Sequence, residues 1–283
     1  MSFSPVVNPV VDFSEYQDEA GQYALTKNVM DNGYCVIKNC DNFKDSVFEI
    51  ASKIAVPQST MYGFTQEIKT EPTPRNIAFS GIYLGPHMDF PYYESPPGIS
   101  FMLCRRNDES VEGGESILID AFEVAEEIRR CSPEDFKVLC EVPVRYQKIH
   151  WDRDDPVYME WEQPHIVVDS EGTITRINWG PAFEGKSKND SMTAEYLKAY
   201  RLFLQKVNES PTKTVRKLEA GECLVFNNRR MLHGRNEFEL NGGTRLLELA
   251  FLNICEFRSR AQVLEITQGD GELVKMIGNQ NTI

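Results

Sequence analysis

The chain has 283 residues and only four histidines, and the sequence around two of them, His87 and His233, suits metal ligands. His87 and Asp89 form an H-x-D triplet, and residues two apart in a strand point to the same face. His233 follows an apolar run far downstream, and Arg245 lies twelve residues beyond it. Two imidazoles and one carboxylate make the facial triad of non-haem iron(II) oxygenases. The order H-x-D, His, Arg therefore suggests an iron(II) site.

An iron(II) site of this kind also explains the arginine. Three protein ligands on one face leave positions for a 2-oxo acid, bound through two oxygens, and for O2. The planar fork of an arginine binds a distal carboxylate through two hydrogen bonds, and the charges of Fe(II), Asp89, 2-oxoglutarate and one arginine sum to zero. Two other interpretations stay open here: a zinc site for hydrolysis, or residues with no shared role.

Composition excludes some classes of protein. The formal net charge is −13 and the pI about 4.9, whereas nucleic-acid-binding proteins show a basic footprint. No apolar stretch is long enough to span a membrane, and the N-terminus does not resemble a secretory signal. The seven cysteines include no CxxC pair. We expect a cytoplasmic protein with free thiols and no membrane or nucleic-acid partner.

Hydrophobic periodicity predicts the elements that would position this site. The expected helices cover residues 16–31 (closed by Gly33), 42–54, 121–130, a segment starting at Ser132, and 193–207. The expected strands cover residues 34–37, 99–103, 116–119, 166–168, 173–179, 223–226 and 246–254. One stripe of the helix at 193–207 is expected to pack in the core: Tyr196, Leu197, Tyr200, Leu204 and Val207.

The order of these elements indicates the fold class. Helices come first, and short strands interrupted by helices follow, which is typical of a mainly β protein, a sandwich or jelly roll, with flanking helices. Neither a repeat nor a low-complexity linker is visible. We therefore interpret residues 1–283 as a single domain.

Several short motifs occur once each, in this order, between residues 20 and 265: Met61-Tyr62-Gly63, His87-x-Asp89-Phe90-Pro91, Pro96-Pro97-Gly98, Gly113-Gly114-Glu115-Ser116, Asp120-Ala121-Phe122, Arg176-Ile177-Asn178, Asn228-Arg229-Arg230-Met231-Leu232-His233-Gly234-Arg235 and Arg258-Ser259-Arg260. With these motifs the chain resembles the catalytic domain of gamma-butyrobetaine hydroxylase and trimethyllysine hydroxylase, within the taurine-dioxygenase-like group.

That resemblance implies a double-stranded β-helix, or jelly roll. It implies Fe(II) at His87, Asp89 and His233, and O2 as a cosubstrate. It also implies that Arg245 binds the carboxylate of the cosubstrate 2-oxoglutarate, with the Ser116 hydroxyl assisting. Members of the group often dimerise, so a homodimer is an expectation too.

The substrate pocket is where the chain departs from the family. Gamma-butyrobetaine enzymes surround a trimethylammonium group with aromatic rings, a cation–π cage. Tyr62 matches one cage position, whereas Gln66 stands in place of Trp, and Phe79 and Phe251 each stand in place of Tyr. Asn178 matches an asparagine that contacts substrate. The chain is also too short to hold the N-terminal zinc module of those enzymes, so we expect none.

The resulting hypothesis is an Fe(II)- and 2-oxoglutarate-dependent dioxygenase. It would oxidise an unactivated C–H bond of a small amine- or carboxylate-bearing substrate, with hydroxylation as the main outcome. One alternative keeps the iron chemistry but gives desaturation or oxidative ring closure of a small amino acid in specialised metabolism. Another is a non-catalytic relative that binds 2-oxoglutarate or metal.

Overall fold

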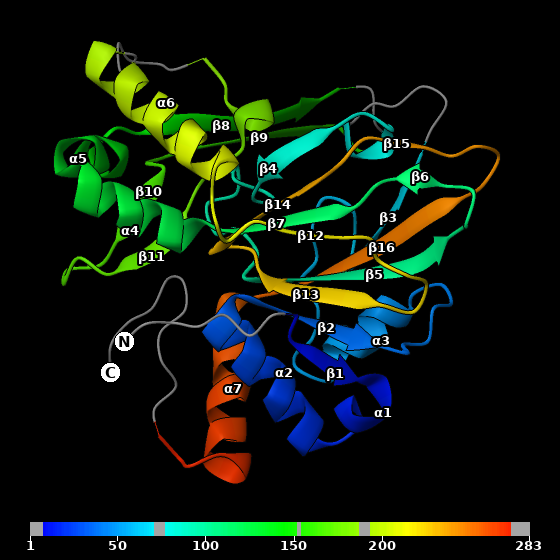
Figure 1. Cartoon of the computed structure of the whole chain (residues 1–283). Helices are drawn as coiled ribbons and strands as arrows, with labels where there is room; N and C mark the ends of the chain where they lie inside the picture. The colour runs from blue at the N-terminus through cyan, green and yellow to red at the C-terminus, as the bar shows by residue number, and fades with distance from the viewer. Residues whose placement is uncertain (1–7, 71–76, 152–153, 187–192, 273–283) are drawn as a thin grey trace.

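The structure is a computed structural model that describes residues 8–70, 77–151, 154–186 and 193–272. Two sheets face each other at its centre, and helices cover their outer sides (Figure 1). The larger sheet has the strand order β1-β2-β13-β5-β16-β3. These strands span Val10–Asp12 (β1), Tyr34–Lys38 (β2), Cys223–Asn227 (β13), Ile99–Asn107 (β5), Arg245–Leu252 (β16) and Thr65–Lys69 (β3).

The smaller sheet has the strand order β12-β7-β14-β4. Its strands span Thr214–Arg216 (β12), Ser116–Asp120 (β7), Met231–Arg235 (β14) and Leu84–His87 (β4). Three two-stranded ribbons are also described: Val144–His150 with Val157–Gln163 (β8, β9), Ile166–Val168 with Ile174–Ile177 (β10, β11), and Glu112–Gly113 with Phe238–Glu239 (β6, β15). Because β14 pairs with both β7 and β4, one strand aligns residues from three separate segments.

The helices form two groups, one on the outside of each sheet (Figure 1). The group over the larger sheet contains Phe13–Tyr16 (α1), Glu19–Asn32 (α2), Ser46–Ser52 (α3) and Ile254–Gln268 (α7). The group beside the smaller sheet contains Ala121–Cys131 (α4), Pro133–Glu141 (α5) and Ala194–Asn208 (α6). Short 3-10 turns lie at Ile77–Phe79 (η1) and Pro181–Phe183 (η2).

Alternation along the strands explains why these apolar runs are buried on both faces. On β13, Cys223 and Val225 face the helices of the first group, while Leu224 and Phe226 enter the space between the sheets. On β7, Leu118 enters that same space, whereas its neighbours Ile117 and Ile119 pack toward α4 and α6. Each central strand therefore contributes to two layers of core, and the cavity described below lies in the middle layer.

Most predicted elements are confirmed, with shifted ends. The helix expected at 16–31 begins at Glu19, because the Asp18 side chain caps it by accepting from the Gly21 N–H. It ends as predicted at Gly33, whose φ of 83° suits glycine. The strand expected at 246–254 stops at Leu252, because Asn253 caps α7. The helix expected at 42–54 is confined to α3.

The predicted core face of α6 is partly wrong. Leu197 and Leu204 are 40% and 37% exposed. The buried positions are Tyr196, Ala199, Phe203 and Val207. Leu197 and Leu204 lie seven residues apart on one side of this stripe, so a helix packed along the stripe leaves both at its edge.

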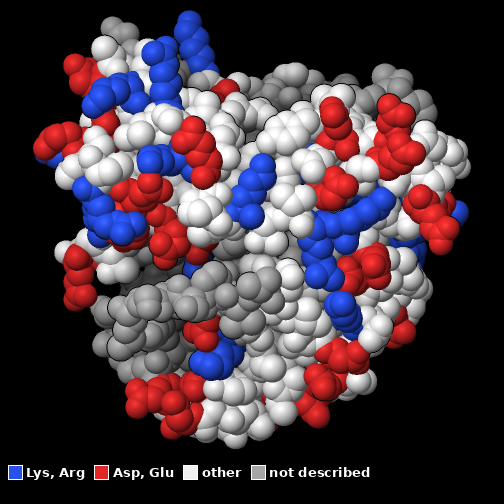
Figure 2. Space-filling view, in the orientation of Figure 1, with Lys and Arg blue, Asp and Glu red and all other residues white. Residues whose placement is uncertain are grey.

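Two expectations about the protein's surroundings can be compared with the structure. All seven cysteines are free, and four of them are buried. Among the described residues, no helix is both long and apolar enough to cross a bilayer. On the face shown in Figure 2, lysine and arginine side chains are interspersed with the more numerous acidic ones.

Candidate metal centre

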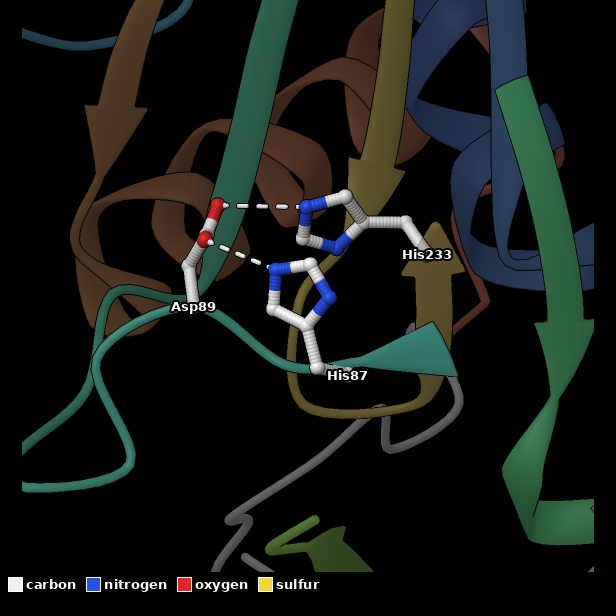
Figure 3. A group of neighbouring side chains, drawn as sticks. All are labelled: His87, Asp89 and His233. Carbon is white, nitrogen blue, oxygen red and sulfur yellow. Dashed lines mark ion pairs between the residues drawn. The ribbon is translucent and has the colours of Figure 1, made fainter. Parts of the chain in front are cut away.

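The two histidines of the predicted triad lie on neighbouring strands. His87 is the last residue of β4, and His233 lies directly opposite it on β14. Their ring centroids are 4.3 Å apart, and both rings are turned toward Asp89 (Figure 3). Gly234 permits this pairing, since a Cβ there would lie 2.6 Å from the Leu84 carbonyl oxygen. The antiparallel register therefore brings together two residues that are 146 positions apart in the sequence.

Asp89 is not positioned by a β-strand, although the H-x-D spacing had predicted one. It lies in a bend after β4 ends, so the strand geometry assumed for residues 87 and 89 is wrong. Backbone hydrogen bonds fix this bend instead. The Met88 N–H donates to the Trp179 carbonyl (2.8 Å), and the Asp89 N–H donates to Asn228 Oδ1 (2.8 Å). Asn228 Nδ2 in turn donates to the Asp89 carbonyl (3.0 Å), which closes a two-bond clamp.

The three side chains are arranged as ligands rather than as hydrogen-bond partners. His87 Nε2 lies 3.7 Å from Asp89 Oδ1, and His233 Nε2 lies 3.6 Å from Asp89 Oδ2. These distances are too long for hydrogen bonds. One ligand atom from each residue falls within 4.8 Å of the others, a gap that an ion with bonds of about 2 Å can fill. Asp89 Oδ2 is buried and has no hydrogen-bond partner. A bound metal ion would provide the missing partner for this oxygen.

The electrostatics of the triad also suit a cation. Burial, with a smaller contribution from His233, lowers the pKa of His87 to about 4, and burial lowers that of His233 to about 4. Both imidazoles are therefore neutral near pH 7, the form that binds metal. His87 Nδ1 lies 2.9 Å from the Gly85 carbonyl, so it carries the proton and leaves Nε2 free as the donor atom. Burial raises the pKa of Asp89, which a bound cation would reverse.

A cavity between the sheets opens beside this triad. Besides the two neutral histidines, the cavity is lined by three charged residues, Asp89, Arg235 and Arg245. Arg245 is only 5% exposed, and its Nη2 donates to the Gly114 carbonyl (3.2 Å). Ser116 lines the same cavity at the start of β7. The two residues predicted to hold the cosubstrate are thus brought to the same cavity as the three predicted ligands.

The structure places two of the five predicted substrate residues at the cavity wall and three away from it. Tyr62 and Gln66 line the cavity, whereas Phe79, Asn178 and Phe251 are not among its lining residues. Phe251 is buried behind Phe90, edge-on at a centroid distance of 5.1 Å. Asn178 is fully buried and donates to the Pro164 carbonyl (2.7 Å). Phe79 ends η1, whose two preceding residues do line the cavity.

Sequence reasoning missed several residues of this site. The aromatic walls of the cavity are completed by Phe90, Tyr92 and Phe183. Arg235 ends the Asn228–Arg235 motif, and the sequence pattern predicted no role for it. Its spacing of two from His233 was an available indication, since the two share one face of a strand. Phe183 gave no comparable indication, because it comes from η2, remote in sequence from the other lining residues.

Replacement of Asn228 by Ala should weaken metal binding without abolishing it. The change removes both hydrogen bonds that fix the Asp89 backbone. Loss of such an outer partner costs about 10–100-fold in metal affinity, and each buried group left unpaired costs about 1–3 kcal/mol of stability. Calorimetry with Mn(II) and urea unfolding would measure both effects. Asn42→Ala, an exposed asparagine elsewhere, is the control, and unchanged Mn(II) affinity in a folded Asn228→Ala protein would contradict the clamp.

A third histidine supports the site from outside the cavity. His165 is completely buried, with Nδ1 2.9 Å from both the Tyr146 hydroxyl and the Asn178 carbonyl, and Nε2 2.9 Å from the Tyr196 hydroxyl. Asn178 immediately precedes Trp179. The Trp179 carbonyl accepts the hydrogen bond from the Met88 N–H, in the bend between His87 and Asp89. His165 therefore helps to fix the backbone at Asn178 and Trp179, which in turn fixes the position of Met88 between the two ligand residues.

The pH dependence of stability should reveal His165. Burial lowers the pKa of His165 from 6.5 to about 4. Between these two pH values the histidine is protonated in the unfolded chain but stays neutral in the folded protein. This part of the stability is complete above pH 6.5 and is lost as the pH falls toward 4. With metal chelated, wild type should lose about 2 kcal/mol more than His165→Gln between about pH 7 and about pH 5. Urea unfolding measures this difference, and equal losses in the two proteins would refute it.

Comparisons of the sequence with known proteins bear on this geometry. The family model described as taurine catabolism dioxygenase TauD, TfdA family, matches residues 3–250. The gamma-butyrobetaine dioxygenase of Pseudomonas sp. (strain AK-1) is 28% identical over 238 residues, which are 84% of this chain and 61% of that protein. The trimethyllysine dioxygenase of Meyerozyma guilliermondii is 26% identical over 240 residues, 83% of this chain and 58% of the relative. The chain thus spans about three fifths of the length of these relatives.

Among solved structures, the fold is similar to that of an asparagine oxygenase in complex with Fe(II), 3-hydroxyasparagine and succinate. The TM-score is 0.63 at 13% identity, with 96% of this chain and 99% of the other covered. At that identity the likeness concerns the fold. It confirms the predicted jelly roll with flanking helices.

Proposed function

The chain belongs to the TauD/TfdA family of dioxygenases, and from this we propose that it is an Fe(II)- and 2-oxoglutarate-dependent dioxygenase that hydroxylates a small molecule. The observation that carries the proposal is the cluster of His87, Asp89 and His233 in a buried cavity that also contains Arg245. Relatives named as gamma-butyrobetaine and trimethyllysine dioxygenases support the reaction class. The reaction would be 2-oxoglutarate + O2 + R–H giving succinate + CO2 + R–OH.

In this proposal His87, Asp89 and His233 hold the iron. The donor set fits Fe(II), because two neutral imidazoles and one carboxylate leave one side of the ion open. When bound, the iron supplies the activation of O2 that no side chain can perform. The protein's own contribution is to keep both imidazoles neutral by burial and to hold Asp89 in place through Asn228.

The cosubstrate would lie between the triad and Arg245. The buried Arg245 guanidinium donates to one carbonyl, and among the described residues no carboxylate lies within ion-pair distance of it, so it has donors left for a carboxylate. Two parallel hydrogen bonds between an arginine and a carboxylate are among the strongest polar contacts available in a protein. The Ser116 hydroxyl, on the same cavity wall, can donate to the same group.

The substrate would occupy the aromatic part of the cavity, next to Tyr62, Phe90, Tyr92 and Phe183. Both dioxygenase relatives are named for substrates with a trimethylammonium group, which aromatic faces can bind. Gln66 adds an amide to this wall in place of another ring. We propose a small amine- or carboxylate-bearing substrate, acted on in the cytoplasm, a location consistent with seven free cysteines.

Succinate release tests the proposal. Purified protein would be incubated with Fe(II), ascorbate, O2 and 2-oxoglutarate, and with a panel of betaines, trimethyllysine and small amino acids. We expect one class to stimulate succinate formation and to gain the mass of one oxygen. A product lighter by two hydrogens would favour desaturation or ring closure instead. No stimulation across the panel, with metal and 2-oxoglutarate still bound, would favour a non-catalytic binding protein.

A further inference from the structure

A second arginine lines the cavity next to the metal centre. Arg235 follows His233 by two positions on β14, so both side chains leave the same face of the strand. It lies opposite Ser116 on β7 and opposite Leu84 on β4. The residue is 5% exposed, and its Nη2 donates to the Ile82 carbonyl (2.9 Å). Its Nη1 is buried without a hydrogen-bond partner, in a residue that belongs to the cavity wall.

The charge of Arg235 is not neutralised by a side chain. Within the described residues, no carboxylate lies within ion-pair distance of its guanidinium. Its Cζ lies 4.6 Å from the centroid of the Phe238 ring, and Cζ of Arg245 lies 5.2 Å from the same centroid. A guanidinium keeps its positive charge near pH 7. Two buried cations around one ring call for an anion.

The strand register indicates which anion this is. His233 and His87 form one opposed pair across β14 and β4, and Arg235 lies one strand repeat further along, beside Ser116. A repeat of two residues spans about 6.6 Å. This is close to the reach of a five-carbon 2-oxo acid whose oxo end is held at the triad. The distal carboxylate of such a molecule would therefore arrive between Arg235 and Arg245.

We propose that Arg235 is a second binding residue for the distal carboxylate of 2-oxoglutarate and shares that group with Arg245. The inference rests on the proposed function. Its specific content is that cosubstrate selectivity comes from a pair of arginines, not from one. A 2-oxo acid of the same length that ends in a methyl group would gain nothing from either cation.

Binding measurements without turnover test this inference. The Mn(II)-loaded protein, without O2, would be titrated by calorimetry with 2-oxoglutarate and with 2-oxopentanoate, which has a methyl group in place of the distal carboxylate. Arg235→Gln should weaken 2-oxoglutarate binding about 10–100-fold, the range expected when one charge-assisted hydrogen bond is lost. Its affinity for 2-oxopentanoate should change less than about threefold, and Arg235→Lys should recover part of the loss.

Controls separate the outcomes. Arg106→Gln, which removes an arginine on the surface, should leave both affinities unchanged. Equal losses for the two 2-oxo acids, or no loss for either in a folded Arg235→Gln protein, would overturn the role of Arg235 and leave the proposed function standing. If wild type binds Mn(II) but neither 2-oxo acid, the proposed function fails together with this inference.

Discussion

Replacement of Asp89 by Asn is expected to reduce succinate formation to background. The substitution keeps the shape of the side chain and its backbone clamp to Asn228 but removes the negative charge that faces two neutral imidazoles. Loss of an outer partner of a metal ligand already costs about 10–100-fold in metal affinity, so loss of the ligand itself should cost more. His87→Ala should have the same effect for the same reason. Mn(II) calorimetry and the succinate assay measure binding and turnover separately.

The control for these two variants is a histidine outside the cavity. His150 lies at the end of β8 and does not line the cavity. His150→Ala should therefore bind Mn(II) and form succinate like wild type. Turnover retained by Asp89→Asn or by His87→Ala, at saturating Fe(II), would remove these residues from the ligand set.

Replacement of Arg245 by Gln is expected to raise the KM for 2-oxoglutarate about 100-fold or more. Arg245 is buried, so its loss would leave a carboxylate unpaired in a medium that solvates it poorly. Breaking a buried ion pair from one side typically costs about 3–5 kcal/mol, and each 1.4 kcal/mol is a factor of ten. Arg245→Lys should recover only part of this loss, since an ammonium cannot form two parallel hydrogen bonds.

The readout for Arg245 is the KM for 2-oxoglutarate compared with the affinity for Mn(II). The metal affinity should stay near the wild-type value, because Arg245 is not one of the three clustered ligand residues. Unchanged KM in the Gln variant would show that the cosubstrate carboxylate lies elsewhere. A collapse of Mn(II) binding as well would point to a structural role for Arg245.

Much of the fold could be predicted because its central strands are short apolar runs. The segments around β2, β5, β7 and β13 were all found, since burial on both faces makes each run continuous. The strands β3, β4 and β14 were not. Thr65–Lys69 is polar on an edge of the sheet, and Leu84–His87 contains glycine and proline, so neither shows a clear strand pattern. Pairing with distant partners makes them strands.

The metal triad could be predicted from residue types, but its geometry could not. The short spacing of His87 and Asp89 was informative even though the strand argument for it was wrong. What holds Asp89 is Asn228, a long-range contact that no local pattern encodes. The same limit applies to the cavity wall: Phe251 follows the lining residues Leu247 and Leu249 on β16, yet Phe90 packs against it and meets the cavity instead.

Isotope labelling with ¹⁸O2 tests the central claim most directly. A single-turnover mixture of the Fe(II)-loaded protein, 2-oxoglutarate and an active compound from the panel would be exposed to ¹⁸O2 and analysed by mass spectrometry. We predict one labelled oxygen in succinate and one in the hydroxylated product, in equal amounts. Unlabelled succinate, or turnover that continues without Fe(II) in the presence of a chelator, would contradict the assignment of this chain as an Fe(II)- and 2-oxoglutarate-dependent dioxygenase.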